Sequence, residues 1–536
     1  MTDVADIIII GSGASGAAAA WSLSKDNSLR IVCFEQGSIP NPSDYPTKSS
    51  DWELSRSDKS SSNPNIRKNT ADYPIDDSES PISIANFNGY GGSTILYSAH
   101  FPRFHPSDFR VKTLDNVAED WPINYSQLNP YFDENEKMMG VAGLVGDTAY
   151  PEYNALLPPV PLGGVGTELA KAFNKMNWHW WPSYAAINTD KRNSRANCIN
   201  LGPCNVGCSQ GAKGSVDVTY WPLARLNGVE VYTESRVYEI TIDSKGLADG
   251  VLYFDKNGNE CKCKAKIVIV ACSGIGTPRL LLNSKSPAFP DGLLNDNGLV
   301  GKNLMLHPLA YVEGVFDKDL KSSLGPHGCC ILSQEFYETR DEHDFLRGYT
   351  MQILRGAPPI ETATAGYFMR QLSIGKNHHK DFQKLFNHTA GIAIISEDLP
   401  EQHNRVELDY ENKDLFGLPG VKVFYEMSDN TKNILKHGIK MSKEIFSSAG
   451  AKVTTSFAPV KNTGWHLMGT ARMGKDPKTS VVNKYGQAHQ VKNLFIVDSS
   501  VFVTSGAVNP VATAQAITLF ACNYIRKNID SIANPL

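Results

Sequence analysis

The chain has 536 residues, of which 41% are hydrophobic and 20% are charged, as in ordinary soluble globular proteins. A formal net charge of −4 offers no global attraction for nucleic acid or for an anionic membrane surface, so we expect neither as a partner. No window is apolar over the length of a membrane span, and the N-terminus lacks the basic region and cleavage site of a signal peptide. We therefore expect a cytoplasmic protein of two or three structural units, whose ten cysteines are mostly reduced.

The first 36 residues predict one βαβ unit that carries a dinucleotide-binding turn. An apolar, β-branched run ends at Ile10, a small-residue helix follows, and a second apolar strand ends at Glu35. Between strand and helix lies the turn G-S-G-A-S-G. Its glycines permit a tight turn, close approach of a pyrophosphate and close helix packing, while Glu35 can accept hydrogen bonds from ribose. The predicted contacts are Gly11, Gly13, Ser15, Gly16 and Glu35.

The motif alone does not choose between NAD and FAD. Its N-terminal position and the Glu-x-Gly sequence that begins at Glu35 favour FAD in a large flavoprotein.

The remaining segments predict a mixed α/β (α+β) fold. Residues 38–80 look like a surface excursion and a candidate lid, residues 126–143 like a helix, and residues 230–272 like antiparallel strands that end in a buried strand. We predict a Rossmann-like FAD-binding domain built from discontinuous segments, with an inserted antiparallel-sheet substrate domain. The FAD-binding domain is predicted to span residues 1–308, with substrate-side segments at about 100–225. The inserted substrate domain is predicted at 309–460, and residues 461–536 return to the FAD domain.

Further motifs follow in a fixed order along the chain. They are Gly91-Gly92-Ser93-Thr94 with Arg103 downstream, S-G-I-G-T-P at 273–278, H-L-M-G-T-A-R-M-G at 466–474, and Asp498 with Asn509-Pro510. Together with the first turn, this set resembles the glucose–methanol–choline (GMC) family of flavin oxidoreductases over nearly the whole chain.

The resemblance implies roles for the matching positions. The first glycines would hold the FAD pyrophosphate and Glu35 the adenosine ribose. The other implied contacts are Gly91, Gly92, Ser93 and Thr94 along the flavin, Val237 at the adenine through its backbone, and Asp498, Asn509 and Pro510 near the ribityl chain and isoalloxazine. Some relatives bind the flavin covalently through a histidine in the loop after Gly-Gly. Leu96 occupies that place here, with His100 nearby, so we expect noncovalent FAD.

The resemblance also implies a catalytic pair. Oxidation of an alcohol requires a base for the hydroxyl proton as hydride leaves the adjacent carbon, and histidine titrates close to neutral pH. His466 stands at the family's catalytic position and Asn509 at that of its partner. An amide cannot act as the base, but it can orient the alcohol oxygen and stabilise developing negative charge. His307, in Leu-His-Pro, is predicted to be structural or to support the site.

Cys198, Cys204 and Cys208 form a C-x5-C-x3-C cluster. Three thiolates at this spacing can hold an iron–sulfur cluster, and a subset of GMC dehydrogenases resembles the chain here. The alternative is a Gly-rich loop with packed, reduced thiols. Zinc is disfavoured because no fourth ligand lies nearby.

The predicted activity is FAD-dependent oxidation of a CH-OH group on a small polar substrate such as a sugar or polyol. Trp178, Trp180, Trp181 and Tyr184 could stack on a sugar, although such a run is more often core. The acceptor, which could be a quinone, a cytochrome or oxygen, is left open. An alcohol oxidase and a redox-silent FAD-containing lyase are the alternatives. The identity of the alcohol and the oligomeric state are not set by the sequence.

Overall fold

The N-terminal βαβ unit lies at the centre of a seven-stranded sheet. The computed structural model describes residues 4–49, 51–55, 58–154, 156–190 and 195–534. The strands of this first sheet are β1 (Ala5–Ile10), β2 (Ile31–Phe34), β5 (Glu230–Tyr232), β6 (Arg236–Ile242), β7 (Ala248–Phe254), β8 (Glu260–Val270) and β16 (Leu494–Ile496). Neighbouring strands pair in parallel from β5 through β2 and β1 to β8, and β16 also pairs in parallel with β8. β7 pairs antiparallel with β8 on one side and with β6 on the other. The sheet therefore joins segments that are distant in sequence.

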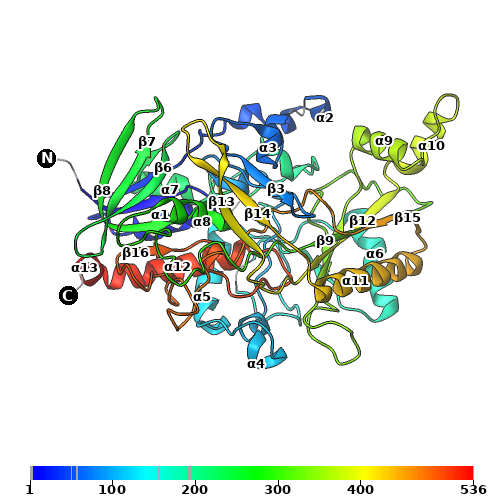
Figure 1. Cartoon of the computed structure of the whole chain (residues 1–536). Helices are drawn as coiled ribbons and strands as arrows, with labels where there is room; N and C mark the ends of the chain where they lie inside the picture. The colour runs from blue at the N-terminus through cyan, green and yellow to red at the C-terminus, as the bar shows by residue number, and fades with distance from the viewer. Residues whose placement is uncertain (1–3, 50, 56–57, 155, 191–194, 535–536) are drawn as a thin grey trace.

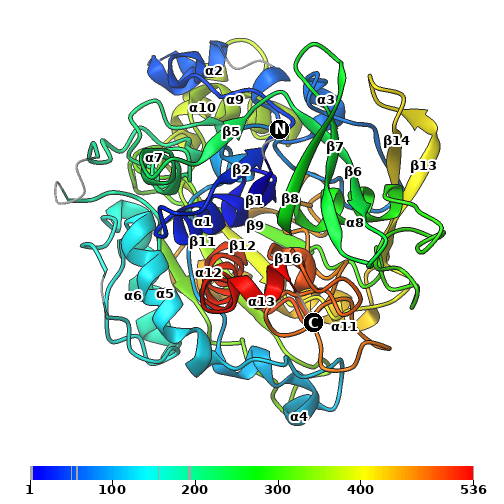
Figure 2. The same cartoon turned by 90° about the vertical axis from the view of Figure 1, so that its left-hand side faces the viewer.

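The alternating isoleucines of β1 explain why this sheet is covered on both faces. Ile7 and Ile9 pack in one core with residues of α1 (Ala14–Leu23), α7 (Tyr220–Leu226) and α12 (Val511–Lys527). Ile8 and Ile10 point to the opposite core, which contains residues of α8 (Ser273–Asn283) and of the β6–β7 pair. Successive side chains of a strand point to opposite faces, so a continuous apolar run requires two cores. Figure 2 shows α1 and α12 side by side over the sheet.

The inserted sheet is antiparallel, and successive side chains along its strands also point to opposite faces. Its strands are β4 (Trp181–Pro182), β9 (Leu309–Val315), β10 (Ile331–Ser333), β11 (Tyr349–Leu354), β12 (Thr389–Ser396) and β15 (Lys452–Phe457). On β11, Met351 and Ile353 belong to the core that also contains residues of α6 (Gly163–Met176) and α11 (Asp429–Ser448). Thr350 and Gln352 therefore face the other way. In Figure 1 this sheet and α11 lie at the opposite end of the molecule from β6–β8.

A third, three-stranded sheet changes two details of the sequence prediction. β3 (Ile75–Glu79) lies inside the 38–80 excursion and pairs in parallel with β14 (Pro419–Phe424), which pairs with β13 (Arg405–Lys413). Val421 and Val423 share a core with Ile75 and with Ile275 of α8. The excursion is thus partly ordered by a distant strand, and residues 309–460 contribute to two sheets. The domain boundaries themselves stay a prediction.

The remaining helices connect or cover these sheets. α5 (Tyr125–Met139) matches the predicted helix, beginning at a capping box of Asn124 and Gln127 and ending at Gly140, whose φ is 67°. The shorter helices are α2 (Trp52–Ser55), α3 (Pro64–Arg67), α4 (Val111–Asp115), α9 (Pro359–Phe368), α10 (His378–Leu385) and α13 (Ile529–Ala533). Across the part of the chain that the structure describes, we find no helix with the length and apolar character of a membrane span.

Candidate active site

The first glycine-rich turn makes contacts that larger residues could not make. Gly11 has φ +99°, and a Cβ there would lie 2.5 Å from the backbone oxygen of Ala271 on the neighbouring strand end. A Cβ on Gly16 would lie 1.8 Å from the oxygen of Gly11, so the helix must begin this close to the strand. Gly13 differs, because its Cβ would meet nothing nearer than Gly92, at 3.7 Å. Gly13 therefore keeps open the space where a pyrophosphate would bind.

The second glycine-rich turn lies against the first. Gly92 has φ +55°, and a Cβ there would lie 2.6 Å from the Cα of Gly13. Within the turn, the Thr94 hydroxyl donates to the Gly91 carbonyl at 2.6 Å and accepts from the Val216 backbone N–H at 3.1 Å. The two turns thus form one cradle at the free N-terminus of α1, where no side chain caps the exposed N–H groups.

Glu35 is held rigidly at the end of β2. Its carboxylate accepts hydrogen bonds from the Ser12 backbone N–H at 3.0 Å, the Ser12 hydroxyl at 2.6 Å and the Gly37 backbone N–H at 2.9 Å. A carboxylate has about four lone-pair sites, so it retains capacity to accept from a ribose hydroxyl. The same turn that forms the anion site therefore also orients the acidic side chain.

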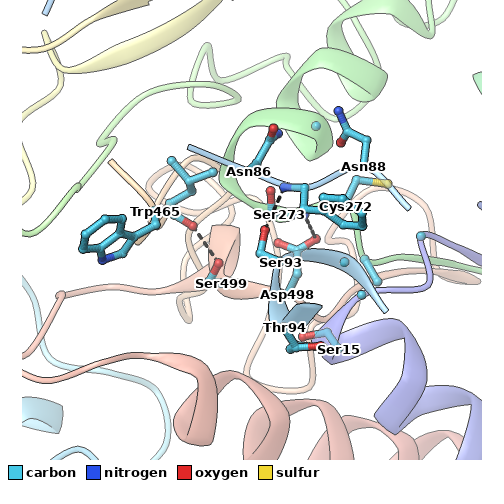
Figure 3. A pocket seen from close by; sticks show the side chains of 18 of the residues that line it. Ser15, Asn86, Asn88, Ser93, Thr94, Cys272, Ser273, Trp465, Asp498 and Ser499 are labelled. Carbon is cyan, nitrogen blue, oxygen red and sulfur yellow. Dashed lines mark hydrogen bonds between the residues drawn. The ribbon is translucent and has the colours of Figure 1, made fainter. Parts of the chain in front are cut away.

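Asp498 ties the C-terminal segment to the start of α8. One carboxylate oxygen accepts from the Ser273 backbone N–H at 3.1 Å and the Thr277 hydroxyl at 2.6 Å, and the other accepts from the Ser500 backbone N–H at 2.8 Å. Figure 3 shows Asp498 bonded to Ser273, with Ser93 beside them. Burial raises the pKa of Asp498, and the hydrogen bonds from Ser500 and Thr277 oppose that shift. Asp498 therefore fixes the geometry of the cavity wall.

A single cavity runs from the glycine turns to the predicted catalytic pair. Of the sequence-predicted residues, it is lined by Gly11, Gly13, Ser15, Glu35, Gly92, Ser93, Thr94, Val237, His466, Asp498, Asn509 and Pro510. Gly16 and Gly91 lie behind the lining, where they shape the two turns. An anion cradle, an adjacent carboxylate and an elongated pocket suit a dinucleotide such as FAD. The individual roles of these residues stay predictions.

The backbone places His307 directly opposite His466. Met305 and Met468 exchange backbone hydrogen bonds as an antiparallel bridge, at 3.1 and 3.2 Å. His307 lies two residues after Met305 and His466 two residues before Met468, and their Nδ1 atoms are 3.0 Å apart. His307 has φ 52°, a left-handed conformation that is uncommon for a side-chain-bearing residue. The Leu-His-Pro turn thus supports the predicted base, as the sequence suggested.

The hydrogen-bond network assigns the tautomers of both histidines. His307 Nε2 lies 2.7 Å from the Gly506 carbonyl oxygen and 3.1 Å from that of Ser505, and carbonyls can only accept. The proton of neutral His307 is therefore on Nε2, and its Nδ1 accepts from His466 Nδ1–H. This leaves the lone pair of His466 on Nε2, which lies 3.2 Å from the amide nitrogen of Asn509.

Burial keeps both imidazoles neutral. It lowers the pKa of His307 to about 4. Burial, followed by the nearby His307 and His100, lowers the pKa of His466 well below its usual value. A neutral His466 is ready to accept a proton on Nε2, and Nδ1–H can donate to His307 throughout.

Sequence reasoning missed Gln352, which orients the second member of the pair. Its side-chain N–H donates to Asn509 Oδ1, so the Asn509 amide nitrogen faces His466. Gln352 is buried on β11 of the inserted sheet, on the face turned away from that sheet's own core. A strand-face pattern alone could have marked it as an inward polar residue, but not as a partner of Asn509.

Two groups singled out in the sequence lie away from the cavity. The Arg103 guanidinium is fully buried and binds both carboxylate oxygens of Glu136 on α5, at 2.6 and 2.7 Å. Trp178 packs edge-on against Phe336, and Tyr184 is buried in a core. No ring of the Trp178–Tyr184 run lines the cavity. Trp178, Trp180 and Trp181 are half-buried and line a separate hollow. The structure therefore places these rings outside the cavity of the predicted catalytic pair, and only Tyr184 is a core residue.

The cysteine loop supports the second glycine turn. Lys213 Nζ donates to the carbonyls of Ile95 and Cys204 at 2.7 Å and of Tyr97 at 3.1 Å, and burial lowers its pKa to about 8. Burial raises the pKa of Cys204 to about 12. Among residues whose positions are described, no three His, Cys, Asp or Glu side chains converge in a set that could hold a metal. The structure thus gives no support to a cluster on Cys198, Cys204 and Cys208.

A dinucleotide cavity that ends at a neutral histidine and an oriented amide defines an FAD-dependent enzyme that oxidises alcohols. Models of the GMC oxidoreductase family match residues 5–309 and 400–518. The chain belongs to this family.

Several proteins of known activity are similar to the chain. The 2-methyl-1,2-propanediol dehydrogenase of Mycolicibacterium austroafricanum is 38% identical over 540 residues, covering 99% of this chain and 97% of the relative. The fructose dehydrogenase large subunit of Gluconobacter japonicus is 26% identical, over 82% of this chain and 81% of its own. The paromamine 6'-oxidase of Streptomyces fradiae is 27% identical, over 98% and 92%. The crystal structure of pyridoxine 4-oxidase from Mesorbium loti superposes with a TM-score of 0.69 at 17% identity, covering 98% of this chain and 99% of the other, and shows the same fold.

Proposed function

We propose that this protein is a dehydrogenase that oxidises a hydroxyl group of a small diol or related polyol, using noncovalently bound FAD. The observation that carries the proposal is the His466–Asn509 pair, which presents a neutral ring nitrogen and an amide N–H 3.2 Å apart at one end of the dinucleotide cavity. The extended similarity to a diol dehydrogenase supports the substrate class.

The geometry of the pair suits deprotonation of an alcohol. An alcohol oxygen that bound against both groups would replace their mutual hydrogen bond. It would donate its proton to His466 Nε2 and accept from the Asn509 amide. As the proton moves to Nε2, Nδ1–H continues to donate to His307, which stabilises the resulting imidazolium. The Asn509 N–H stabilises the negative charge that develops on the oxygen. FAD, when bound, supplies the acceptor for the hydride.

Leu96 supports noncovalent binding, because it lines the cavity and its aliphatic side chain has no group that could bond to a flavin. The electron acceptor is a quinone, a cytochrome or oxygen. The described cysteines do not form a group that could hold a metal ion, so nothing in their geometry supports an iron–sulfur cluster. The cytoplasmic location stays a prediction of the sequence.

Anaerobic flavin reduction tests the proposal. Small diols should bleach the flavin absorption of the wild-type protein, whereas His466→Ala should retain FAD and reduce it roughly 10²–10⁴-fold more slowly. His403→Ala is the matched control, because His403 is exposed and outside the cavity. Full-rate reduction in His466→Ala would contradict the assignment of the base. A wild-type flavin that no diol or polyol bleaches would favour the redox-silent lyase, and stoichiometric peroxide in air would favour the oxidase.

A further inference from the structure

His100 is a buried histidine whose ring nitrogens have no hydrogen-bond partner among the residues that the structure describes. Its side chain lines the same cavity as His466 and Asn509 and is only 4% exposed. The Gly328 backbone lies beside the ring but does not form a hydrogen bond of good geometry with either nitrogen. The His100 backbone is fixed by a bridge to Ala185. Buried donors and acceptors without partners are destabilising and uncommon, so such a ring in a ligand cavity points to a ligand that hydrogen-bonds to it.

The charge of the site indicates the chemistry of that ligand. Burial lowers the pKa of His100 to about 4, opposed by the backbone of Gly328, so at neutral pH the ring offers one donor and one acceptor without charge. Lys213 does not line the cavity, and its Nζ is bound to three backbone carbonyls. Arg279, which lines the cavity as well, is bound to Asp414 and to the Pro419 carbonyl. A neutral hydroxyl, which both donates and accepts, fits this ring better than a carboxylate or an ammonium group.

We propose that His100 binds the second hydroxyl of a vicinal diol while the reacting hydroxyl lies between His466 and Asn509. The inference rests on the proposed function, and it assigns the preference for diols to one side chain. His100 and His466 line the same cavity. A vicinal diol bound there would present one hydroxyl to each ring.

The packing around the ring supports a fixed position. A Cβ on Gly328 would lie 2.7 Å from the Ser98 side chain and 3.3 Å from His100 Nε2, so only glycine lets this loop approach the ring. A ring held in place loses little conformational entropy when it binds a ligand, which favours selective recognition.

The test compares a diol with its mono-alcohol in the FAD-loaded protein. Stopped-flow flavin reduction is measured with 1,2-propanediol and 1-propanol in the wild type, His100→Leu and His100→Asn. Loss of one or two hydrogen bonds should lower the rate constant over Kd for the diol by roughly 10–100-fold in His100→Leu and leave 1-propanol within about 3-fold. His100→Asn, which keeps a donor and an acceptor, should retain part of the preference. An unchanged diol-to-alcohol ratio in His100→Leu would overturn the inference, provided that both variants keep the wild-type ratio of flavin to protein absorbance.

A non-oxidisable diol separates this inference from the proposed function. Pinacol has two neighbouring tertiary hydroxyls, and neither carbon that bears a hydroxyl carries a hydrogen that could leave as hydride. Its binding can be followed as a shift of the flavin spectrum. We expect pinacol to bind the wild type at least 10-fold more tightly than tert-butanol does, and His100→Leu to lose this difference. Equal binding of pinacol to wild type and His100→Leu would refute the role of His100, even if no substrate reduced the flavin. Loss of the pinacol preference without turnover would retain the role of His100 and reject the proposed reaction.

Discussion

Gln352 offers a test of how far the inserted sheet controls catalysis. Its side chain donates to Asn509 Oδ1, and this bond directs the amide nitrogen of Asn509 towards His466 Nε2. Gln352→Met would keep the length of the side chain but remove the donor. The Asn509 amide could then rotate and place its oxygen against the lone pair of His466, where two acceptors oppose each other. The alcohol oxygen would lose its amide N–H at the same time.

The magnitude follows from one lost hydrogen bond and one misdirected amide. A buried hydrogen bond that is left unmade costs about 1–3 kcal/mol, which corresponds to roughly 5–160-fold in rate. We therefore expect Gln352→Met to slow anaerobic flavin reduction by roughly 10–100-fold while FAD content and affinity stay at the wild-type level.

Thr350 provides the matched control for this experiment. It lies two residues away on the same face of β11 and is fully buried, and its hydroxyl has no hydrogen-bond partner in the described part of the chain. Thr350→Val should therefore reduce flavin within about 2-fold of wild type. The reasoning fails if Gln352→Met reduces flavin as fast as wild type, or if Thr350→Val is slowed equally.

Three further predictions follow from the cavity. Gly13→Ala should fold normally but bind FAD at least 10-fold more weakly, because a Cβ fits at Gly13 but occupies the space for the pyrophosphate. Gly16→Ala should lower the melting temperature of the apoprotein, because a Cβ does not fit there. Calorimetry and FAD titration measure the two effects, and equal effects of both variants would contradict this prediction. Acid or heat should release all the FAD, since Leu96 cannot bond to it, and flavin fluorescence that stays with the denatured chain on a gel would contradict this. Burial lowers the pKa of His307 and of His100 to about 4, whereas an unfolded histidine titrates near about 6.5, so protons bind the unfolded chain first and stability falls as pH falls from 6.5 towards 4. At pH 5 each buried neutral ring should lower the free energy of unfolding by about 2 kcal/mol. Urea unfolding should therefore show a smaller loss of stability between pH 7 and pH 5 in His100→Leu than in the wild type. Equal losses in the two proteins would show that His100 does not contribute to the pH dependence.

The parts of the fold that were predicted from the sequence rest on local patterns. The turn at Gly11–Gly16 lies between a buried strand and a small-residue helix, and each of these three features is visible within 30 residues. α5 could be predicted in the same way, because the spacing of its apolar residues is visible in the sequence. The antiparallel strands before Val270 showed alternation and a turn at Asp255, where Gly258 donates to the Asp255 carbonyl.

The missed features depend on contacts between distant segments. Nothing within residues 38–80 shows that Ile75 pairs with Val421, because the pairing depends on where β14 lies in space. Gln352 is one polar residue on a mostly apolar strand, and its role exists only because Asn509 reaches it from 157 positions away. The predicted support from His307 could be named from its motif, but the direction of its proton could not, since the carbonyls of residues 505–506 decide it.

The two ends of the cavity are therefore built on different principles. The FAD end is specified by short turns in which glycine is sterically required, so its geometry is fixed locally. The end where we propose that the alcohol binds is assembled from separate segments that carry His100, His307, His466 and Asn509, and from Gln352 on the inserted sheet. Changes in the inserted sheet can therefore alter how Asn509 and its neighbours meet an alcohol without disturbing the cradle at Gly11 and Gly13. Such a division is compatible with the different substrates in the names of similar proteins, which are 2-methyl-1,2-propanediol, fructose and paromamine.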